Sequence, residues 1–324
     1  MIKVAITRKI PDTGIELLKK HFKQVALISK GDFCNKKQLL KEIKNADALL
    51  SLLTEKIDQE VIDTGKNLKI IANYAVGYNN IDVDYATGRG IYVTNTPGIL
   101  TETTADFAFT LLMSTARRVG EAERFSRAGK FKSWGPRLLC GQDIHGKTLG
   151  IIGMGRIGRA VATRAALGFD MNILYSDNSV SPKLPFAARK VELQELLQES
   201  DFISLHVPFL ESTFHLIGEK ELAMMKPTAV LINTSRGPVI DEKALIRALQ
   251  QKQLFAAGLD VFENEPQIPR ELKKLDNIII TPHIGSASVE TRDGMAEMAA
   301  QNIIDFFNGK TPGQLVNKKV LKQG

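Results

Sequence analysis

Short apolar runs recur along the chain, separated by longer segments whose apolar residues recur every three or four positions. In the first hundred residues these runs are IKVAIT, QVALIS, ADALLS, LKIIANYA and IYVTNTP. They are rich in Ile and Val and bounded by turn residues, which is typical of buried strands, whereas the segments between them have the period of helices. Strands that alternate with helices predict a parallel sheet covered by helices.

The same pattern restarts near residue 148 and predicts a second, longer sheet. Its strands are expected in TLGIIGMG, NILYSD, DFISLHVP, TAVLINTS, FAAGLDVF and NIIITPH. A chain of 324 residues is also long enough for two domains. The sequence therefore predicts an α/β protein with two doubly wound parallel sheets.

Two helices mark where one predicted domain passes into the other. Thr101–Lys132 contains no proline and has apolar residues at helical spacing in its first half, so we expect one long helix there. The turn residues Pro97 and Gly98 precede it and indicate a boundary. A second helix, in ASVETRDGMAEMAAQNIIDFFNG, could return to the first domain. We expect one domain from residues 1–98 and 288–324, and another from residues 99–287.

Composition restricts the class of protein. The net charge is +7, but Lys and Arg are interspersed with Asp and Glu, and no nucleic-acid motif accompanies them. We therefore expect a solvated basic surface and no nucleic-acid partner. The two cysteines, Cys34 and Cys140, lack metal-ligand spacing, and neither a signal peptide nor an apolar run of 18 residues is present. These features favour a reduced, cytoplasmic protein without a metal or a membrane partner.

The stretch LGIIGMGRIGRA contains a glycine pattern typical of dinucleotide binding. Gly153, Gly155 and Gly158 lie between an expected strand and an expected helix, and Asp177 ends the next strand. In such a unit the first glycine makes the tight turn, the second admits the pyrophosphate and the third lets helix and strand pack closely. A turn without a ligand, and Asp177 as a plain turn residue, are the alternatives.

Polar side chains follow several expected strands of the second sheet. His283 closes NIIITPH, Arg236 follows LINTS, and Asp260 and Glu265 lie in GLDVFENEP. Because the carboxyl ends of parallel strands meet at one sheet edge, these groups are expected to converge there. They could pair only with one another, or form a redox site for carboxylic acids. The remaining histidines carry no such context: His21, His145, His206 and His215.

The motifs YAVGYNNIDVDYATGRGIYVTNTPG, TETTADFAFTLL, GMGRIGRAVA, LINTSRGPVIDEKAL, AAGLDVFENEP and TPHIGS resemble those of the D-isomer-specific 2-hydroxyacid dehydrogenases. The chain is most similar to their glyoxylate and hydroxypyruvate reductase branch. The resemblance implies a flavodoxin-like substrate domain, completed by the C-terminal segment, into which a Rossmann NAD-binding domain is inserted. It also implies that Arg236, Glu265 and His283 are the catalytic residues.

The resemblance extends to the binding residues. The substrate carboxylate would bind the backbone N–H groups of Val76 and Gly77, and the substrate would also contact Arg236 and His283. The residues implied at the NAD site are Thr104, Gly153, Gly155, Arg156, Ile157, Gly158, Asp177, His206, Val207, Pro208, Thr234, Ser235, Arg236, Asp260, His283, Gly285 and Ser286.

These assignments imply a chemistry. His283 would protonate the carbonyl oxygen of a 2-oxo acid during hydride transfer from NADH, because imidazole titrates near neutral pH. Glu265 would orient the ring, Arg236 would hold the carboxylate, and Asp260 would hold the nicotinamide carboxamide. We expect glyoxylate or hydroxypyruvate as substrate. NAD is expected over NADP because Asp177 would repel a 2′-phosphate and the following NSVSP holds no Arg, Lys183 being the nearest cation.

Other functions remain open. The same fold also serves as an NAD-sensing binding protein or corepressor, and phosphoglycerate and 2-ketoaldonates are alternative substrates within the family. The family also implies a homodimer. Trp134 matches a position that reaches the neighbouring subunit in some members, but it could equally be a plain surface aromatic.

Overall fold

The computed structural model describes residues 1–31, 33–178 and 183–322. The chain divides into two compact units, which are described separately. Unit 1 comprises Met1–Leu100 and Ala287–Gly324, and unit 2 comprises Thr101–Ser286. The substrate and cofactor roles expected for the two parts of the chain stay predictions.

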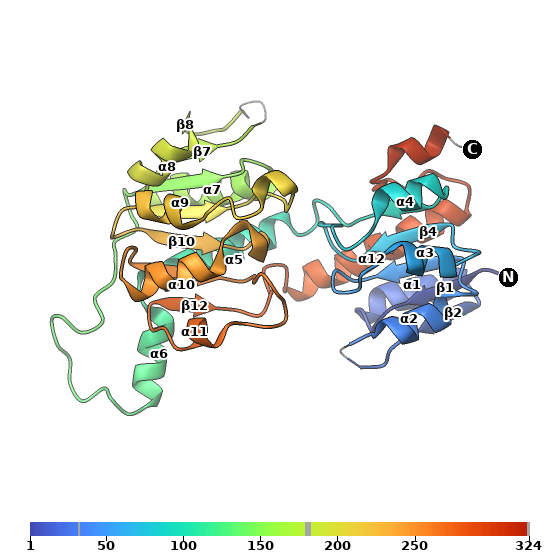
Figure 1. Cartoon of the computed structure of the whole chain (residues 1–324), viewed down its shortest axis with the longest axis horizontal. Coiled ribbons are helices and arrows are strands. Elements are labelled where there is room, and N and C mark those ends of the chain that lie inside the picture. The colour runs from blue at the N-terminus through green and yellow to red at the C-terminus, as the bar shows by residue number, and fades with distance from the viewer. Residues whose placement is uncertain (32, 179–182, 323–324) are drawn as a thin grey trace. The chain divides into compact units, whose positions relative to one another are not determined.

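Unit 1 is a parallel sheet with helices packed on it (Figure 1). The strand order β2-β1-β3-β4-β5 is that of flavodoxin-like folds. The strands are β1 (Lys3–Ile6), β2 (Gln24–Leu27), β3 (Ala48–Ser51), β4 (Ile70–Asn73) and β5 (Tyr92–Thr94). The helices are α1 (Asp12–His21), α2 (Lys36–Ile43), α3 (Gln59–Thr64), α4 (Val83–Gly88), α12 (Val289–Phe307) and the short 3₁₀ helix η3 (Lys318–Lys322).

The last long helix, α12, belongs to the core of unit 1. It packs against α1 and against strands β3 and β4. Small residues allow this close approach, because a Cβ on Gly14 of α1 would lie only 2.7 Å from the carbonyl oxygen of Ala296 on α12. The C-terminal segment therefore completes the unit that the N-terminal strands begin.

Unit 2 contains the longer parallel sheet, in the order β12-β11-β10-β9-β6-β7-β8. This is the Rossmann order with one added strand. All strands are parallel, and from β6 the chain first builds the sheet toward β8 and then, from β9, toward the opposite edge. The strands are β6 (Thr148–Ile152), β7 (Asn172–Ser176), β8 (Ala188–Lys190), β9 (Phe202–Leu205), β10 (Val230–Asn233), β11 (Ala256–Leu259) and β12 (Ile278–Ile280). The helices are α5 (Thr101–Ala116), α6 (Val119–Arg127), α7 (Arg156–Phe169), α8 (Leu193–Glu199), α9 (Glu219–Met224), α10 (Glu242–Gln250) and α11 (Arg270–Lys273), with 3₁₀ helices η1 (Glu211–Thr213) and η2 (Gly237–Val239).

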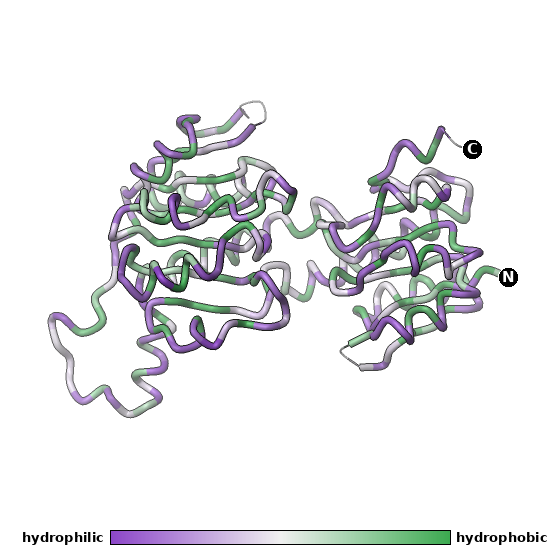
Figure 2. Tube along the Cα trace, viewed as in Figure 1, coloured by the Kyte–Doolittle hydropathy of each residue, from purple (hydrophilic) through white to green (hydrophobic). Residues whose placement is uncertain are grey.

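The expected fold class is confirmed, since both units are parallel-sheet α/β structures. Figure 2 shows hydrophobic segments along the sheets and more hydrophilic stretches on the helices that cover them. Strands β3, β4, β9, β10 and β11 are buried along their whole length, which explains why they read as continuous apolar runs. Among the described residues, no helix has the length and apolar character needed to cross a bilayer.

One expectation about an element was wrong, and one short strand was not expected. The long helix expected over Thr101–Lys132 is interrupted between α5 and α6, where Arg118 adopts a left-handed conformation with φ of 55°. The Ala116 carbonyl at the end of α5 accepts a hydrogen bond from the Gln142 N–H (2.9 Å), so a returning segment terminates the helix. The short edge strand β8 was not expected, because its sequence Ala-Arg-Lys lacks an apolar pattern.

Candidate active site

The glycine loop joins β6 to α7 at the point where the order of the sheet reverses. Gly153 has a φ of +94°, and a Cβ there would lie 2.8 Å from the backbone carbon of His206. A Cβ on Gly158 would lie 2.1 Å from the Gly153 carbonyl oxygen, so this glycine is required for packing. A Cβ on Gly155 would meet no described atom within 4 Å. The side of the loop at Gly155 is therefore open, as a pyrophosphate at the start of α7 requires.

The residues after β7 and β9 surround this loop. The Asp177 carboxylate accepts a hydrogen bond from the Met154 N–H (2.7 Å). A Cβ on Gly153 would also approach a Val207 methyl carbon to 2.9 Å. Burial lowers the pKa of His206 to about 4, so its ring is neutral near pH 7. His206, Val207 and Pro208 follow β9, and Arg156 and Ile157 open α7.

Asp260 organises the loop that follows β12. It is 1% exposed, and its carboxylate accepts hydrogen bonds from the Thr281 hydroxyl (2.7 Å) and from the N–H groups of Ile284 (2.8 Å) and Gly285 (2.7 Å). Burial raises the pKa of Asp260, and these donors offset that effect only in part. A Cβ on Gly285 would lie 3.6 Å from a carbon of Thr104 on α5, so Thr104 borders the same loop, in which Ser286 is the last residue of unit 2.

His283 and Glu265 form a pair at this edge of the sheet. His283 Nδ1 lies 2.8 Å from Glu265 Oε2, and the two side chains are 27% and 28% exposed. His283 has a φ of 55°, and its N–H donates to the Asp260 carbonyl oxygen (2.9 Å). Burial alone would raise the pKa of Glu265, but the bond and charge of His283, the Phe262 N–H and Arg236 together lower it. Glu265 is thus an ionised carboxylate that orients an imidazole ring.

Arg236 follows β10 on the same edge. In the described part of the chain its guanidinium makes one hydrogen bond, from Nη1 to the Ser235 carbonyl oxygen (2.6 Å), so other N–H groups can donate to an anion. Burial lowers the pKa of Arg236, and the charge of Glu265 opposes this effect. The neighbouring Thr234 hydroxyl is buried without a hydrogen-bond partner among the described residues. A buried hydroxyl of this kind can hydrogen-bond to water or to a polar ligand.

Together these features fit a dinucleotide. The open side of the loop at Gly155, the start of a 14-residue helix at Arg156 and the unsatisfied hydroxyl of Thr234 all lie after strands at the carboxyl edge of one sheet. Unit 2 therefore places an open glycine turn, an imidazole–carboxylate pair and a guanidinium at one edge of its sheet, groups that can hold an anion and exchange a proton.

Asparagines shape the expected substrate loop of unit 1, a role that we did not predict. Asn73 ends β4 and donates to the Gly77 carbonyl oxygen (2.8 Å), and Asn95 donates to the Val76 carbonyl oxygen (2.8 Å). Asn80 reaches the Leu52 carbonyl oxygen (3.0 Å). The bonds from Asn73 and Asn95 fix the carbonyl groups of Gly77 and Val76, and the bond from Asn80 ties the loop to the residue after β3. The only sequence signal was the position of Asn73 at the end of a strand.

The sequence pattern also gave no indication of a role for His215. It was placed among four histidines without functional context, but its Nε2 lies 2.6 Å from Glu263 Oε1. Glu263 is two residues from Glu265, in the same loop. No spacing along the chain links residue 215 to residue 263, so the pairing appears only in the fold.

Comparisons with known proteins identify the family. The model of the D-isomer specific 2-hydroxyacid dehydrogenase NAD binding domain matches residues 109–285, within unit 2. A glyoxylate reductase from Korarchaeum cryptofilum is 53% identical over 324 residues, covering 99% of this chain and 97% of that protein. A crystal structure of a Thermus thermophilus protein has a TM-score of 0.91 at 43% identity, covering 97% of this chain and 100% of the other. An NADPH-dependent glyoxylate/hydroxypyruvate reductase from Sinorhizobium meliloti, solved with NADP and malonate, has a TM-score of 0.86 at 32% identity, covering 98% and 97%. The chain belongs to the D-isomer specific 2-hydroxyacid dehydrogenase family.

Proposed function

We propose that the protein reduces a small 2-oxo acid, glyoxylate or hydroxypyruvate, with NADH, and that hydroxypyruvate gives the D-2-hydroxy acid. The observation that carries this proposal is the pair of His283 and Glu265 at 2.8 Å, on the sheet edge that also bears Arg236. The names of the similar proteins from Korarchaeum cryptofilum and Sinorhizobium meliloti support the substrate class.

Each residue has a chemical task in this proposal. When bound, the nicotinamide supplies the hydride. His283, as imidazolium, gives a proton to the carbonyl oxygen of the substrate, and Glu265, 2.8 Å from Nδ1, keeps the ring oriented. Arg236 holds the substrate carboxylate and polarises the carbonyl group. The backbone N–H groups of Val76 and Gly77 are proposed as further carboxylate donors.

Asp260 receives a task that differs from the sequence expectation. Its two carboxylate oxygens already accept bonds from Thr281, Ile284 and Gly285. We therefore propose that Asp260 acts at the nicotinamide end of the site chiefly by fixing the loop that carries His283. The other cofactor residues keep the roles that the family resemblance gives them.

The cofactor is proposed to be NAD rather than NADP. The carboxylate of Asp177 stands at the end of β7 and is held by Met154, where a Rossmann unit receives the adenosine ribose. A 2′-phosphate there would meet a like charge. The turn residues 179–182, which lack an Arg in the sequence, lie outside the described residues. Because the Sinorhizobium meliloti protein is NADPH-dependent, the preference needs a direct measurement.

A panel of 2-oxo acids assayed with NADH and with NADPH tests the proposal. We expect glyoxylate and hydroxypyruvate to give the highest kcat/KM, with NADH preferred by roughly a hundredfold, about 2.7 kcal/mol. Asp177→Asn keeps an acceptor for the Met154 N–H but removes the negative charge, so it should reduce the ratio of kcat/KM for NADH to kcat/KM for NADPH. A tenfold higher kcat/KM for a large branched 2-oxo acid would overturn the substrate assignment, and equal kcat/KM values for the two cofactors would overturn the role of Asp177.

A further inference from the structure

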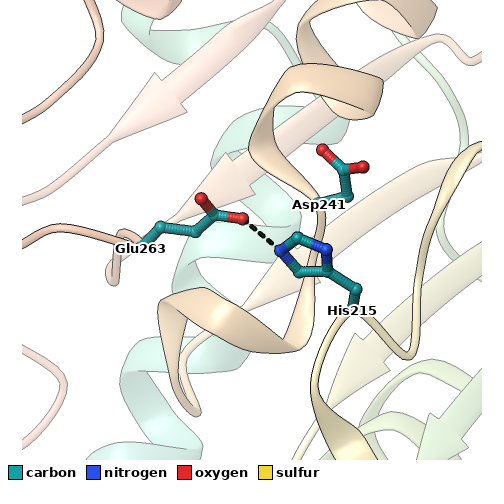
Figure 3. Close-up of side chains that lie close together, drawn as sticks. All are labelled: His215, Asp241 and Glu263. Carbon is teal, nitrogen blue, oxygen red and sulfur yellow. Dashed lines mark hydrogen bonds and ion pairs between the residues drawn. The ribbon is translucent and has the colours of Figure 1, made fainter.

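Three ionisable side chains gather beside the loop that carries Glu265. His215 precedes α9, Asp241 precedes α10, and Glu263 follows β11, and their ligand atoms lie within 4.8 Å of one another (Figure 3). In the figure the His215 ring faces the Glu263 carboxylate, to which it is joined by the 2.6 Å contact. The side chains of His215 and Glu263 are only 33% and 21% exposed.

One oxygen of each carboxylate in this cluster already accepts hydrogen bonds within the protein. Asp241 Oδ1 accepts a hydrogen bond from the Ala244 N–H (3.0 Å) and so caps α10. Glu263 Oε1 accepts from the Glu242 N–H (3.3 Å) in addition to its contact with His215. A metal ion bound through His215 Nε2 would have to break the 2.6 Å contact of this atom with Glu263. The cluster is therefore better explained as a clamp on the protein chain than as a metal site.

The clamp acts on the backbone of residues 262–263. The Glu263 N–H donates to Glu242 Oε1 (2.8 Å), so Glu263 is held by both its backbone and its side chain. A Cβ on Gly237 would lie 1.9 Å from the Phe262 carbonyl carbon and oxygen, which shows how closely η2 packs on this segment. The segment thus has little freedom to move away from α10 and η2.

The same segment determines where the Glu265 carboxylate lies. Glu265 Oε1 accepts from the Phe262 N–H (3.0 Å), while Oε2 contacts His283 Nδ1 (2.8 Å). A displacement of residues 262–263 would therefore move the carboxylate that orients His283. Misplacement of a catalytic group by about 1 Å can cost about a hundredfold in rate.

We propose that His215 is a positioning residue: through its bond to Glu263 it holds the segment that keeps Glu265 against His283. This inference rests on the proposed function, because it assigns His215 a role in the proton transfer by His283. His215 itself does not contact the reacting groups. Its effect on turnover should therefore pass through Glu263 and should not appear in the binding of NADH.

The test compares variants of the pair in the full chain. For His215→Ala and for Glu263→Ala we expect kcat for hydroxypyruvate to fall 10- to 100-fold, with KM and the Kd for NADH changed less than threefold. Glu263→Gln keeps an acceptor for the imidazole and should retain kcat within about threefold. Because the two residues act as a unit, the double variant His215→Ala/Glu263→Ala should be no slower than either single variant.

Controls separate positioning from a loss of stability. Arg247→Ala removes an exposed ion pair of the same unit, with Glu219 (3.0 Å), that does not touch the loop, and should leave kcat unchanged. If His215→Ala does not fold, Glu263→Gln and His215→Gln are measured in its place. A tenfold loss of kcat in Glu263→Gln contradicts the inference. A lower Tm with wild-type kcat in His215→Gln contradicts it as well. A rise in KM alone, or a lower Tm with unchanged kcat in His215→Ala, overturns it too. His283→Ala is measured alongside: unchanged turnover there contradicts the proposed function, whereas its loss together with normal turnover in His215→Ala contradicts only the positioning role.

Discussion

The protonation of His206 makes the stability of unit 2 depend on pH. Burial lowers the pKa of His206 from 6.5 to about 4, and its Nε2 lies 2.8 Å from the Ser204 hydroxyl oxygen. Between these pH values the unfolded chain binds a proton that the folded chain does not. The free energy of unfolding therefore falls as the pH falls from about 6.5 to about 4, by at most about 3 kcal/mol.

The variant His206→Asn tests this dependence. It lacks the titrating ring, so its free energy of unfolding should vary less between pH 7 and pH 4.5 than that of the wild type, as measured by urea denaturation. His145→Asn, at an exposed position, is the matched control and should keep the wild-type slope. Parallel pH profiles for wild type and His206→Asn would show that the folded chain binds this proton as readily as the unfolded chain does.

Single residues differ in how far the sequence could predict their place. His283, Arg236 and Glu265 each follow a recognisable strand, so the rule that strand ends converge brings them to one edge. Asn73 and His215 act through partners that the pattern of apolar residues does not reveal. Side-chain pairs between distant loops depend on tertiary packing, which periodicity does not encode.

At the level of elements, two glycines between β6 and the start of α7, Gly155 and Gly158, have different structural roles. A Cβ on Gly158 would clash at 2.1 Å with the Gly153 carbonyl oxygen, whereas a Cβ on Gly155 would meet no described atom within 4 Å beyond its chain neighbours. We expect Gly158→Ala to destabilise the protein by about 1–3 kcal/mol. Gly155→Ala should change stability by less than about 1 kcal/mol but weaken NADH binding at least tenfold.

Gly168→Ala, within the same helix α7, is the control for the glycine variants. A helical alanine there should stabilise the protein by about 0.5–1 kcal/mol and leave the Kd for NADH unchanged. Thermal unfolding and fluorescence titration with NADH provide the two readouts. Tight NADH binding by Gly155→Ala would mean that the pyrophosphate does not approach the loop at this glycine.

The predicted elements show where sequence patterns are sufficient. Each expected strand is present. A short apolar run rich in Ile and Val between turn residues is too short for a buried helix, so it forms a buried strand. The expected long helix divided into α5 and α6, because its apolar period fades after Ala116 and the segment ending near Gln142 bonds to that carbonyl. Strand β8 forms by pairing with β7 alone and carries no apolar signal of its own.

At the scale of the whole molecule, helix α6 and the segment that follows it extend away from the sheet of unit 2 (Figure 1), and they carry exposed apolar side chains. Trp134 is 80% exposed, Phe131 59% and Val119 50%. Exposed apolar residues on one projecting segment suit an interaction surface, and the family resemblance implies a homodimer. We therefore predict a homodimer whose mass by sedimentation equilibrium is twice 35.8 kDa.

Charged substitutions locate the surface that forms the predicted dimer. Trp134→Asp combined with Phe131→Asp should give a monomer, because a carboxylate is costly to bury in an apolar interface. Leu167→Asp changes another exposed apolar residue of unit 2, on α7, and should leave the dimer intact. A monomeric wild type, or a double variant that remains dimeric, would rule out this segment as the dimer surface.

The central claim is that His283 transfers the proton in NADH-dependent reduction of a 2-oxo acid. The most direct measurement is kcat for hydroxypyruvate reduction by wild type and by His283→Ala, with the Kd for NADH determined on the same samples. We predict that kcat falls by roughly 10²- to 10⁴-fold while the Kd for NADH stays within about threefold, since acid catalysis is lost and the cofactor contacts remain. Equal kcat values for the two proteins, or a wild type that binds NADH tightly but turns over no 2-oxo acid, would contradict the claim.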